Sequence, residues 1–291
     1  MALFFRFAVS APVFFAASIL FCVFPGFAHA DNYAEGVHFF KKGQFQRALY
    51  EFQEGAKEED PRCQYALGLM YVHGRDIDED SRKAFLWVKR AADQGLPQAQ
   101  NYLGTLYAEG KGTAKNDAMA FEMYRRSAEQ NFPDAQYNLA AYYASGHVVK
   151  KDFTAAVKLL RRAVSRQLPE AQYALGTMYA SGSGVPKSER QALNWYIQAA
   201  QRGYAKAQNK LGVLLVNGKG VDKNPNNAVA WFQLAAERGY APAQYNLGRL
   251  YETGIGVEAN RKKAIDLYRK ASEQGNKPAA ARLTTLYRSG K

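Results

Sequence analysis

The stretch Ala243-Gln244-Tyr245-Asn246-Leu247-Gly248 recurs along the chain with small changes. The earlier copies start at Cys63, Ala99, Ala135, Ala171 and Ala207, and Ala279 opens a final half-copy. Each start lies 36 residues after the previous one, without an insertion across six complete units. A fixed period of this length is typical of repeat proteins, in which each unit packs against its neighbours.

Each unit contains two amphipathic helices. If the Ala or Cys that opens the unit is position 1, the first helix carries its apolar or small residues at positions 1, 5, 8, 9 and 12, which share one helix face. In the last complete unit, Gly254 is expected to end this helix with a left-handed cap, and Gly248 is expected to let a neighbouring helix come close. The second helix is expected to begin near Ala264 and to end near Gly275. Because one helix pair cannot bury these faces alone, the pattern predicts an all-α solenoid of stacked pairs.

The units resemble the Sel1-like repeat family, a relative of the tetratricopeptide repeats. The matching signature is A-x-x-x-L-G-x-x-Y-x-x-G-x-G-V followed by A-x-x-W-Y/F-x-x-A-A, and it is most complete in residues 171–200 and 207–236. The resemblance covers residues 63–291 and implies a right-handed α/α superhelix with six Sel1-like repeats in residues 63–278. The unit from Ala135 departs from the signature, because Ala140 replaces the Gly and the loop Gly146-His147-Val148 lacks the second Gly. A weakened loop is expected there.

The two ends of the solenoid are expected to be caps. In residues 31–62, Gly36 and Ala48 are 12 residues apart, whereas the corresponding Gly68 and Ala84 are 16 apart. This shorter spacing resembles a tetratricopeptide helix pair. Residues 279–291 form half a unit, which we expect to be a C-terminal capping helix with a polar outer face.

Residues 1–30 have the pattern of a secretory signal peptide. Arg6 precedes an apolar run through Phe24, and Ala28-His29-Ala30 forms an A-x-A cleavage site, which predicts a mature start at Asp31. A retained membrane anchor is the alternative. After cleavage no membrane-spanning segment is expected, and 38 basic residues face 26 acidic ones, a net charge of +12. Only Cys63 remains, so no internal disulfide can form, and because every other unit has Ala there, a buried small residue is expected. An intermolecular disulfide is the alternative.

The first helices are candidates for a partner-binding surface, since the resemblance implies that they line the concave side. Positions 3, 7, 10 and 11 of each unit are expected to be exposed there. The candidate residues are Tyr65, Asn101, Tyr137, Tyr173, Thr177, Asn209, Tyr245 and Arg249. Tyrosine and asparagine combine apolar area with hydrogen bonding, which suits a polypeptide partner. The alternative is that the recurring tyrosine serves repeat packing.

Basic residues recur on the second helices. Positions 27 and 28 are Lys89-Arg90, Arg125-Arg126, Arg161-Arg162 and Arg269-Lys270. The candidate anion-binding patch comprises Lys150, Lys151, Lys158, Arg161, Arg162 and Arg166. Such residues could bind an acidic glycan or an anionic envelope surface. The alternative is that cations near helix C-termini complement the helix dipole and keep the protein soluble.

No catalytic or metal-binding pattern stands out. The mature histidines His38, His73 and His147 are far apart, and the glycine-rich loops recur as structural connections. We therefore expect a non-enzymatic protein without a metal or other cofactor and without a nucleic-acid partner. The main hypothesis is an exported bacterial adaptor, periplasmic or secreted, that holds protein partners. The alternatives are a glycan- or peptidoglycan-binding protein and a cell-wall or β-lactam hydrolase. The members of the family assigned to hydrolysis carry a disulfide in each repeat, which this chain lacks.

Overall fold

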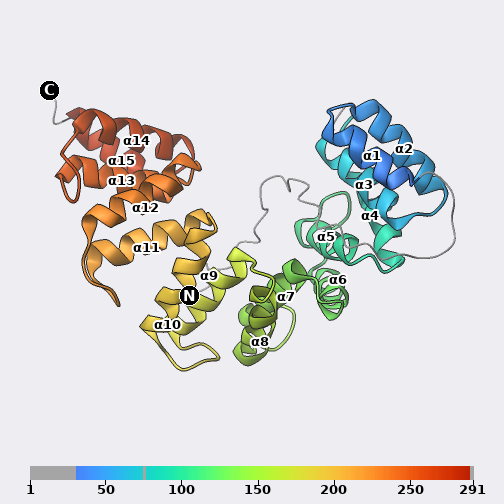
Figure 1. Cartoon of the computed structure of the whole chain (residues 1–291), viewed down its shortest axis with the longest axis horizontal. Coiled ribbons are helices and arrows are strands. Elements are labelled where there is room, and N and C mark those ends of the chain that lie inside the picture. Colours follow the sequence, from blue (N-terminus) through green and yellow to red (C-terminus); the bar gives the residue numbers. More distant parts are fainter. Residues whose placement is uncertain (1–30, 75–76, 289–291) are drawn as a thin grey trace. The chain divides into compact units, whose positions relative to one another are not determined.

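The computed structural model describes residues 31–74 and 77–288, and this part consists of fifteen α-helices without a strand (Figure 1). It divides into two compact units, one ending at Asp152 and the other beginning at Phe153. The first unit contains α1 Asn32–Lys41, α2 Phe45–Lys57, α3 Pro61–His73, α4 Ser81–Asp93, α5 Pro97–Glu109, α6 Asp117–Glu129 and α7 Pro133–Ser145. The second contains α8 Phe153–Val164, α9 Pro169–Ser181, α10 Glu189–Gln201, α11 Ala205–Asn217, α12 Pro225–Glu237, α13 Ala241–Thr253, α14 Arg261–Glu273 and α15 Lys277–Arg288. The predicted signal peptide and its cleavage site lie outside the described residues.

Within each unit the helices pack in sequence order. In the second unit, α9 packs against α10, α11 against α12 and α13 against α14. The second helix of each pair also packs against the first helix of the next pair, as α10 does on α11 and α12 on α13. This confirms the predicted all-α solenoid of stacked helix pairs.

The helix ends follow local chemistry, with a shift from the predicted boundaries. Helix α13 ends at Gly254, whose φ of 71° is the left-handed cap that the sequence predicts. Helix α14 begins at Arg261, three residues before the predicted Ala264. The helix starts earlier because Asn260 caps it: the side chain of Asn260 accepts a hydrogen bond of 2.9 Å from the backbone N–H of Lys263. The apolar pattern does not include this cap.

Glycine at position 6 makes room for the second helix of its own repeat. A Cβ at Gly248 would lie 2.8 Å from Cε1 of Tyr268, and one at Gly212 would lie 2.6 Å from Cε1 of Phe232. Both rings are almost completely buried, at 0% and 2% exposure. The predicted close approach is confirmed, and the neighbour is an aromatic ring rather than a helix backbone.

The loop of the repeat from Ala135 keeps the first glycine, and His147 contacts the preceding repeat in place of the second glycine. Gly146 adopts the left-handed cap with φ of 69°. In other repeats the second glycine touches the start of the preceding second helix, and a Cβ at Gly184 would lie 2.4 Å from the carbonyl oxygen of Phe153. In the exceptional loop, Nε2 of His147 instead lies 3.0 Å from Oδ2 of Asp117, the first residue of α6. The altered sequence thus retains contact with the preceding repeat.

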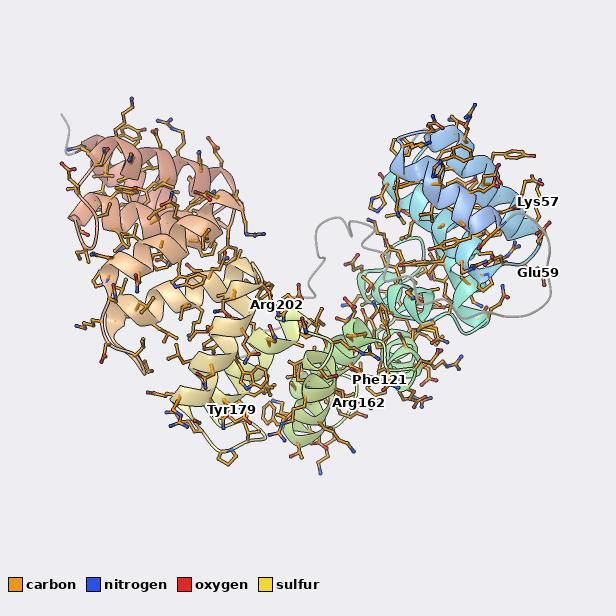
Figure 2. The ribbon with its side chains drawn as sticks, viewed as in Figure 1. Lys57, Glu59, Phe121, Arg162, Tyr179 and Arg202 are labelled. Carbon is orange, nitrogen blue, oxygen red and sulfur yellow. The ribbon has the colours of Figure 1, made fainter. Side chains whose placement is uncertain are left out.

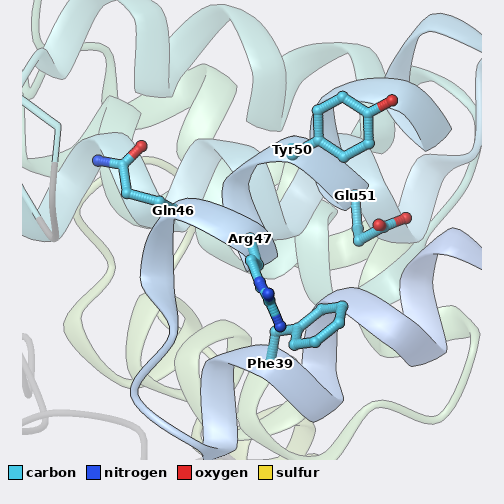
Figure 3. A pocket seen from close by; sticks show the side chains of 5 residues that line it. All are labelled: Phe39, Gln46, Arg47, Tyr50 and Glu51. Atoms are coloured by element: carbon cyan, nitrogen blue, oxygen red, sulfur yellow. The ribbon is translucent and has the colours of Figure 1, made fainter.

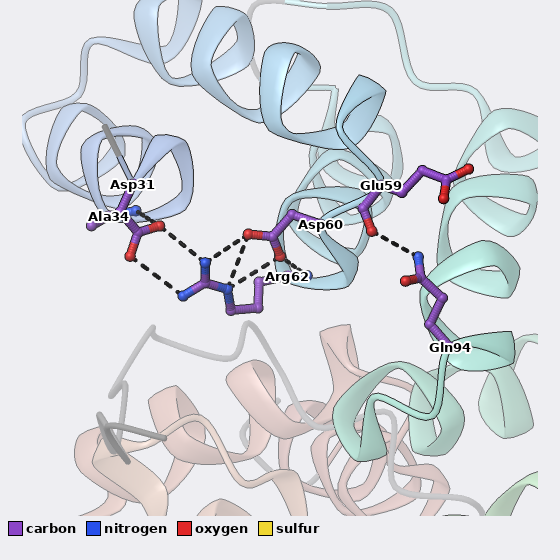
Figure 4. Close-up of polar contacts among 6 residues, drawn as sticks. All are labelled: Asp31, Ala34, Glu59, Asp60, Arg62 and Gln94. Atoms are coloured by element: carbon purple, nitrogen blue, oxygen red, sulfur yellow. Dashed lines mark hydrogen bonds and ion pairs between the residues drawn. The ribbon is translucent and has the colours of Figure 1, made fainter. Parts of the chain in front are cut away.

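A polar cluster joins the N-terminal helix pair to the first repeat (Figure 4). The guanidinium of Arg62 donates to Asp60 at 2.6 Å and to Asp31 at 3.1 Å, and it stacks on the ring of Tyr33 at 5.0 Å. Asp31 also caps α1 by accepting from the backbone N–H of Ala34. Beside this cluster, Cys63 is fully buried, which confirms the expected small core residue.

Candidate functional site

The predicted binding residues lie on the first helices of the repeats, which we call the first-helix face. Tyr65 lies on α3, Asn101 on α5, Tyr137 on α7, Tyr173 and Thr177 on α9, Asn209 on α11, and Tyr245 and Arg249 on α13. Arg249 is exposed and the others are half-buried. The first three belong to the first unit and the other five to the second. We therefore describe each unit's face by itself.

Position 3 contacts the first helix of the next repeat. The amide Nδ2 of Asn246 donates to Oδ1 of Asn209 at 2.8 Å, which joins α13 to α11. In the first unit, Asn138 donates to Asn101 in the same way at 3.0 Å. At the equivalent place Tyr65 meets Tyr102, with ring centroids 6.1 Å apart. These residues therefore hold consecutive first helices together and expose only part of their surface.

The tyrosine rings of the second unit also pack on the second helices. Tyr173 lies 5.4 Å from the ring of Tyr196, and Tyr245 lies 5.7 Å from the ring of Tyr268. In the first unit, burial raises the pKa of Tyr65. Packing and partial exposure coexist at these positions, so the predicted partner-binding role remains a prediction.

The predicted exposure of this strip is wrong at three alanines. Ala108 and Ala144 at position 10 and Ala141 at position 7 are buried, at 5%, 6% and 7% exposure. Ala180, Val72 and Val216, also at position 10, stay half-buried. Position 11 is exposed in all six repeats, at His73, Glu109, Ser145, Ser181, Asn217 and Thr253.

Three of the four basic pairs on the second helices contain a residue that forms an ion pair with an acid of its own helix. Lys89 pairs with Asp93 at 2.6 Å. Arg125 and Arg126 both donate to Glu122 at 2.8 Å, and they lower the pKa of that carboxyl to about 2. Arg269 lies 3.5 Å from Asp266. These surface pairs reduce the net positive charge that the second helices present to an anionic partner.

The candidate anion-binding patch falls in both units. Lys150 and Lys151 belong to the first unit, and Lys158, Arg161, Arg162 and Arg166 belong to the second, and all six are exposed. Arg161 donates to the hydroxyl of Tyr179 at 3.1 Å. Lys158, Arg161 and Arg166 make no ion pair with another described residue. These three side chains thus keep a positive charge that no described acid neutralises in an ion pair.

A recurring buried glutamine was missed in reading the sequence. Position 2 is Gln64, Gln100, Gln136, Gln172, Gln208 and Gln244, and each is at most 5% exposed. In three repeats its Oε1 accepts from a glutamine at position 32, with distances of 2.9 Å from Gln94, 2.8 Å from Gln130 and 2.8 Å from Gln274. The sequence does contain a signal for this glutamine, because five units open with Ala-Gln and the sixth with Cys-Gln.

Where position 32 is arginine, the glutamine oxygen loses this partner. Position 32 is Arg202 in the repeat of Gln172 and Arg238 in that of Gln208 (Figure 2 labels Arg202). Oε1 of Gln172 and Oε1 of Gln208 are buried without a hydrogen-bond partner among the described residues. The glutamine is therefore a structural residue whose bonding varies with its neighbour.

Each of the two units contains a cavity. The larger, of about 370 Å³, lies on the N-terminal helix pair and is lined by Phe39, Gln46, Arg47, Tyr50 and Glu51 (Figure 3). The guanidinium of Arg47 lies 5.5 Å from the centroid of Phe39. The smaller, of about 80 Å³, lies among α9, α10 and α11. In the described ranges no three His, Cys, Asp or Glu residues are placed to hold a metal ion.

Comparison with known proteins identifies the repeats. The family model described as Sel1 repeat matches residues 61–96, 97–132, 133–167, 169–204, 205–240 and 241–276. These matches have the predicted period and begin two residues earlier, at the helix starts. No curated protein matches the chain.

Solved structures agree with the family model. A Sel1 repeat protein from Oxalobacter formigenes is 28% identical with a TM-score of 0.77, and the similarity covers 84% of this chain and 97% of that one. The protein c5321, a protective antigen present in uropathogenic Escherichia coli strains and displaying an SLR fold, is 31% identical with a TM-score of 0.66, over 88% of this chain and 56% of that one. The immunity protein Pa5087 from Pseudomonas aeruginosa, 21% identical over 75% of this chain and 83% of its own, has a TM-score of 0.54 and shares the fold. The chain belongs to the Sel1 repeat family.

Proposed function

We propose that this chain is an exported scaffold that binds polypeptide partners on its first-helix face and positions or regulates them at the cell envelope or at a host surface. Sel1 repeat proteins generally mediate protein–protein interactions and are typically non-enzymatic. The similar c5321 is a protective antigen of a pathogen, which supports a surface or secreted role. Within the described ranges no helix is both long and apolar enough to cross a membrane.

The observation that carries the proposal is the first-helix face of the second unit. Helices α11 and α13 contact each other directly, and the bond between Asn246 and Asn209 ties them together. Across α11 and α13 the face therefore forms a continuous surface on which Asn209 and Tyr245 are half-buried and Arg249 is exposed. A rigid surface that combines aromatic area, amide groups and one guanidinium suits recognition of a polypeptide, because little side-chain freedom is lost on binding.

A second candidate function is binding of an anionic envelope surface by α8. It is favoured by Lys158, Arg161 and Arg166, which are exposed and make no ion pair in the described part of the chain. Attraction of this kind is screened within about 8 Å at physiological ionic strength. Binding to anionic vesicles or to peptidoglycan should then fall steeply with salt. Binding that does not respond to salt would exclude this candidate.

Partner capture with altered faces tests the main proposal. The bait is the mature chain 31–291, incubated with an envelope extract of the source bacterium. Tyr173→Phe, Tyr245→Phe and Arg249→Ala are combined, because phenylalanine keeps the ring packing that alanine would remove. The matched control combines Arg190→Ala, Asn194→Ala and Lys262→Ala, all exposed on second helices. The proposal predicts that the first set loses a partner that the control retains, and equal capture by both sets would contradict it.

Export is tested separately by the mass of the protein from the envelope fraction. We propose cleavage after Ala30, which would leave Asp31 at the start of the mature chain as the cap of α1. The expected mass is that of residues 31–291. A full-length mass in the membrane fraction would instead support the retained anchor.

A further inference from the structure

The small cavity of the second unit lies where the repeats from Ala171 and Ala207 meet. Its volume is about 80 Å³. Ala180, Leu193 and Leu214 provide apolar walls, and the polar groups at the cavity come from Lys210, Lys219, Glu189 and Tyr196. These residues belong to α9, α10, α11 and the loop after α11, which are adjacent in Figure 1. The cavity is therefore built from both repeats and depends on their packing.

Lys210 is an unusual residue for its place in the repeat. It occupies position 4, where the other repeats have the uncharged Ala66, Tyr102, Asn138, Ala174 and Asn246. Its side chain is half-buried, and its Nζ lies 5.8 Å from the centroid of the buried Tyr196 ring. It makes no ion pair and no hydrogen bond with another described residue. Burial, and then the nearby charge of Lys219, lower the pKa of Lys210.

The charged groups around the cavity carry a net positive charge of one, which a single negative group would balance. The cavity is lined by two ammonium groups, those of Lys210 and Lys219, and by a single carboxylate, that of Glu189. The apolar walls suit methylene groups, which a phosphate or sulfate ion lacks. The cavity volume of about 80 Å³ is close to that of one short acidic side chain. For comparison, one water molecule in the liquid occupies roughly 30 Å³.

The cavity also adjoins the first-helix face. The hydroxyl of the cavity residue Tyr196 donates to Oγ1 of Thr177 at 3.4 Å, and Thr177 is a residue of that face. A polypeptide that lies along α9 and α11 would therefore pass beside the cavity.

We propose that the cavity receives the carboxylate of an aspartate or glutamate side chain from the bound polypeptide, between the ammonium groups of Lys210 and Lys219. This inference rests on the proposed function, because it names the chemistry of a partner on the same face. The lysines supply charge-assisted hydrogen bonds, and the apolar wall contacts the methylenes of the acidic residue. An acidic partner also agrees with the net charge of +12 predicted for the mature chain.

The test is an NMR titration of the mature chain with N-acetyl-glutamate amide, observed at the lysine side chains. The expected result is a saturable shift of Lys210 and Lys219 and a rise in the pKa of Lys210. N-acetyl-glutamine amide, which has the same shape without the charge, should cause neither change. N-acetyl-alanine presents a chain-end carboxylate, and tighter binding of this probe would overturn the assignment to an acidic side chain.

Lys210→Ala supplies the matched variant, because Ala66 and Ala174 occupy the same position in folded repeats. It should weaken binding of the glutamate probe about tenfold, roughly the effect of one charge-assisted hydrogen bond. Lys206→Ala, on the same helix and outside the cavity, should leave binding unchanged. Equal binding by the Lys210 variant, or equal response to the glutamine probe, would overturn the inference.

Partner capture separates this inference from the proposed function. If Lys210→Ala captures the partner as well as the native chain while the first-helix variants do not, the scaffold proposal stands and the carboxylate site is wrong. If the glutamate probe binds through Lys210 but no partner depends on the first-helix face, the anion site stands and the scaffold proposal fails.

Discussion

A residue shortly after the end of each second helix adopts a left-handed conformation, whatever its identity. Position 33 is glycine at Gly95, Gly203, Gly239 and Gly275, but Glu59, Asn131 and Gln167 adopt φ of 64°, 62° and 65° at the equivalent place. An L residue in this region costs roughly 1–2 kcal/mol, and asparagine costs less because its short side chain tolerates the conformation. The repeat geometry therefore imposes local strain where glycine is absent.

Gln167→Gly should relieve this strain. We expect the free energy of unfolding to rise by about 1 kcal/mol, because glycine adopts a positive φ without a Cβ clash. The urea midpoint of the mature chain measures the change. Asn131→Gly is the matched control, and its free energy of unfolding should rise less. If Gln167→Gly is less stable than the native chain, the side chain of Gln167 stabilises the fold by more than its left-handed backbone destabilises it.

Glycine at position 6 limits the volume available to the second helix. A Cβ at Gly212 would lie 2.6 Å from the ring of Phe232. In the repeat from Ala135, the sequence itself has Ala140 at position 6 and the smaller Leu160 at the position of the aromatic residue. In that repeat the added Cβ is thus accompanied by a smaller side chain on the second helix.

Gly212→Ala should destabilise the chain by about 1–3 kcal/mol, as overpacking of a core does. Phe232→Leu provides space for the added methyl, so the double variant should be more stable than the sum of the single effects predicts. Thermal unfolding of the four proteins gives this coupling energy. Strict additivity would mean that the ring does not limit this position.

At the scale of elements, glutamine pairs connect the second helix to the first helix of the same repeat in three repeats, and in two of these the donor glutamine also bonds the preceding helix pair. Gln130 donates both to Gln100 and to the carbonyl oxygen of Gly95, each at 2.8 Å. The oxygen of Gln172 lacks such a donor, and Arg202 stands at the donor's position. A buried polar atom without a partner costs free energy.

Arg202→Gln should restore the missing bond and raise the free energy of unfolding by about 1 kcal/mol. The reverse change, Gln274→Arg, should lower it, because Oε1 of Gln244 would lose its donor. Urea unfolding measures both, and a helical circular-dichroism signal of native size confirms the fold. A decrease in Arg202→Gln would refute the assigned role of the glutamine pair.

The C-terminal helix is joined to the last repeat by a charge pair. Arg282 on α15 donates from Nε to both carboxylate oxygens of Glu252 on α13 at 3.0 Å, and Tyr268 also donates to this carboxylate at 2.7 Å. The hydrogen bond from Arg282 is the main cause of the lowered pKa of Glu252. The pair thus ties α15 to α13.

Because the pKa of Glu252 is lowered by folding, this contribution to stability is present above the ordinary glutamate pKa of about 4.3 and is lost as the pH falls through the lowered value. Arg282→Leu should therefore be less stable than the native chain at pH 7, with a difference that shrinks below about pH 4. Thermal unfolding at both pH values checks this. A difference independent of pH would mean that the alkyl chain of Arg282, rather than its charge, holds α15.

At the scale of the whole molecule, the period of 36 residues was sufficient to predict the all-α solenoid, because neighbouring pairs must bury one another's apolar faces. The helix starts were less predictable, since caps such as Asn260 lie outside the apolar pattern. For the candidate site, the sequence predicted which repeat positions lie on the first helices but not which of their side chains are exposed. Burial at Ala108 and Ala144 depends on neighbouring helices, and the cavity beside Lys210 depends on the packing of two repeats.

Site-specific photo-crosslinking tests the central claim most directly. A photoreactive phenylalanine analogue replaces Arg249, exposed on α13 of the first-helix face, or Lys262, exposed on α14, in the chain expressed in its own bacterium. The account predicts a discrete crosslinked protein from position 249 and none from position 262. Crosslinks to the same protein only from position 262 would contradict it, because the partner would then lie on the second helices.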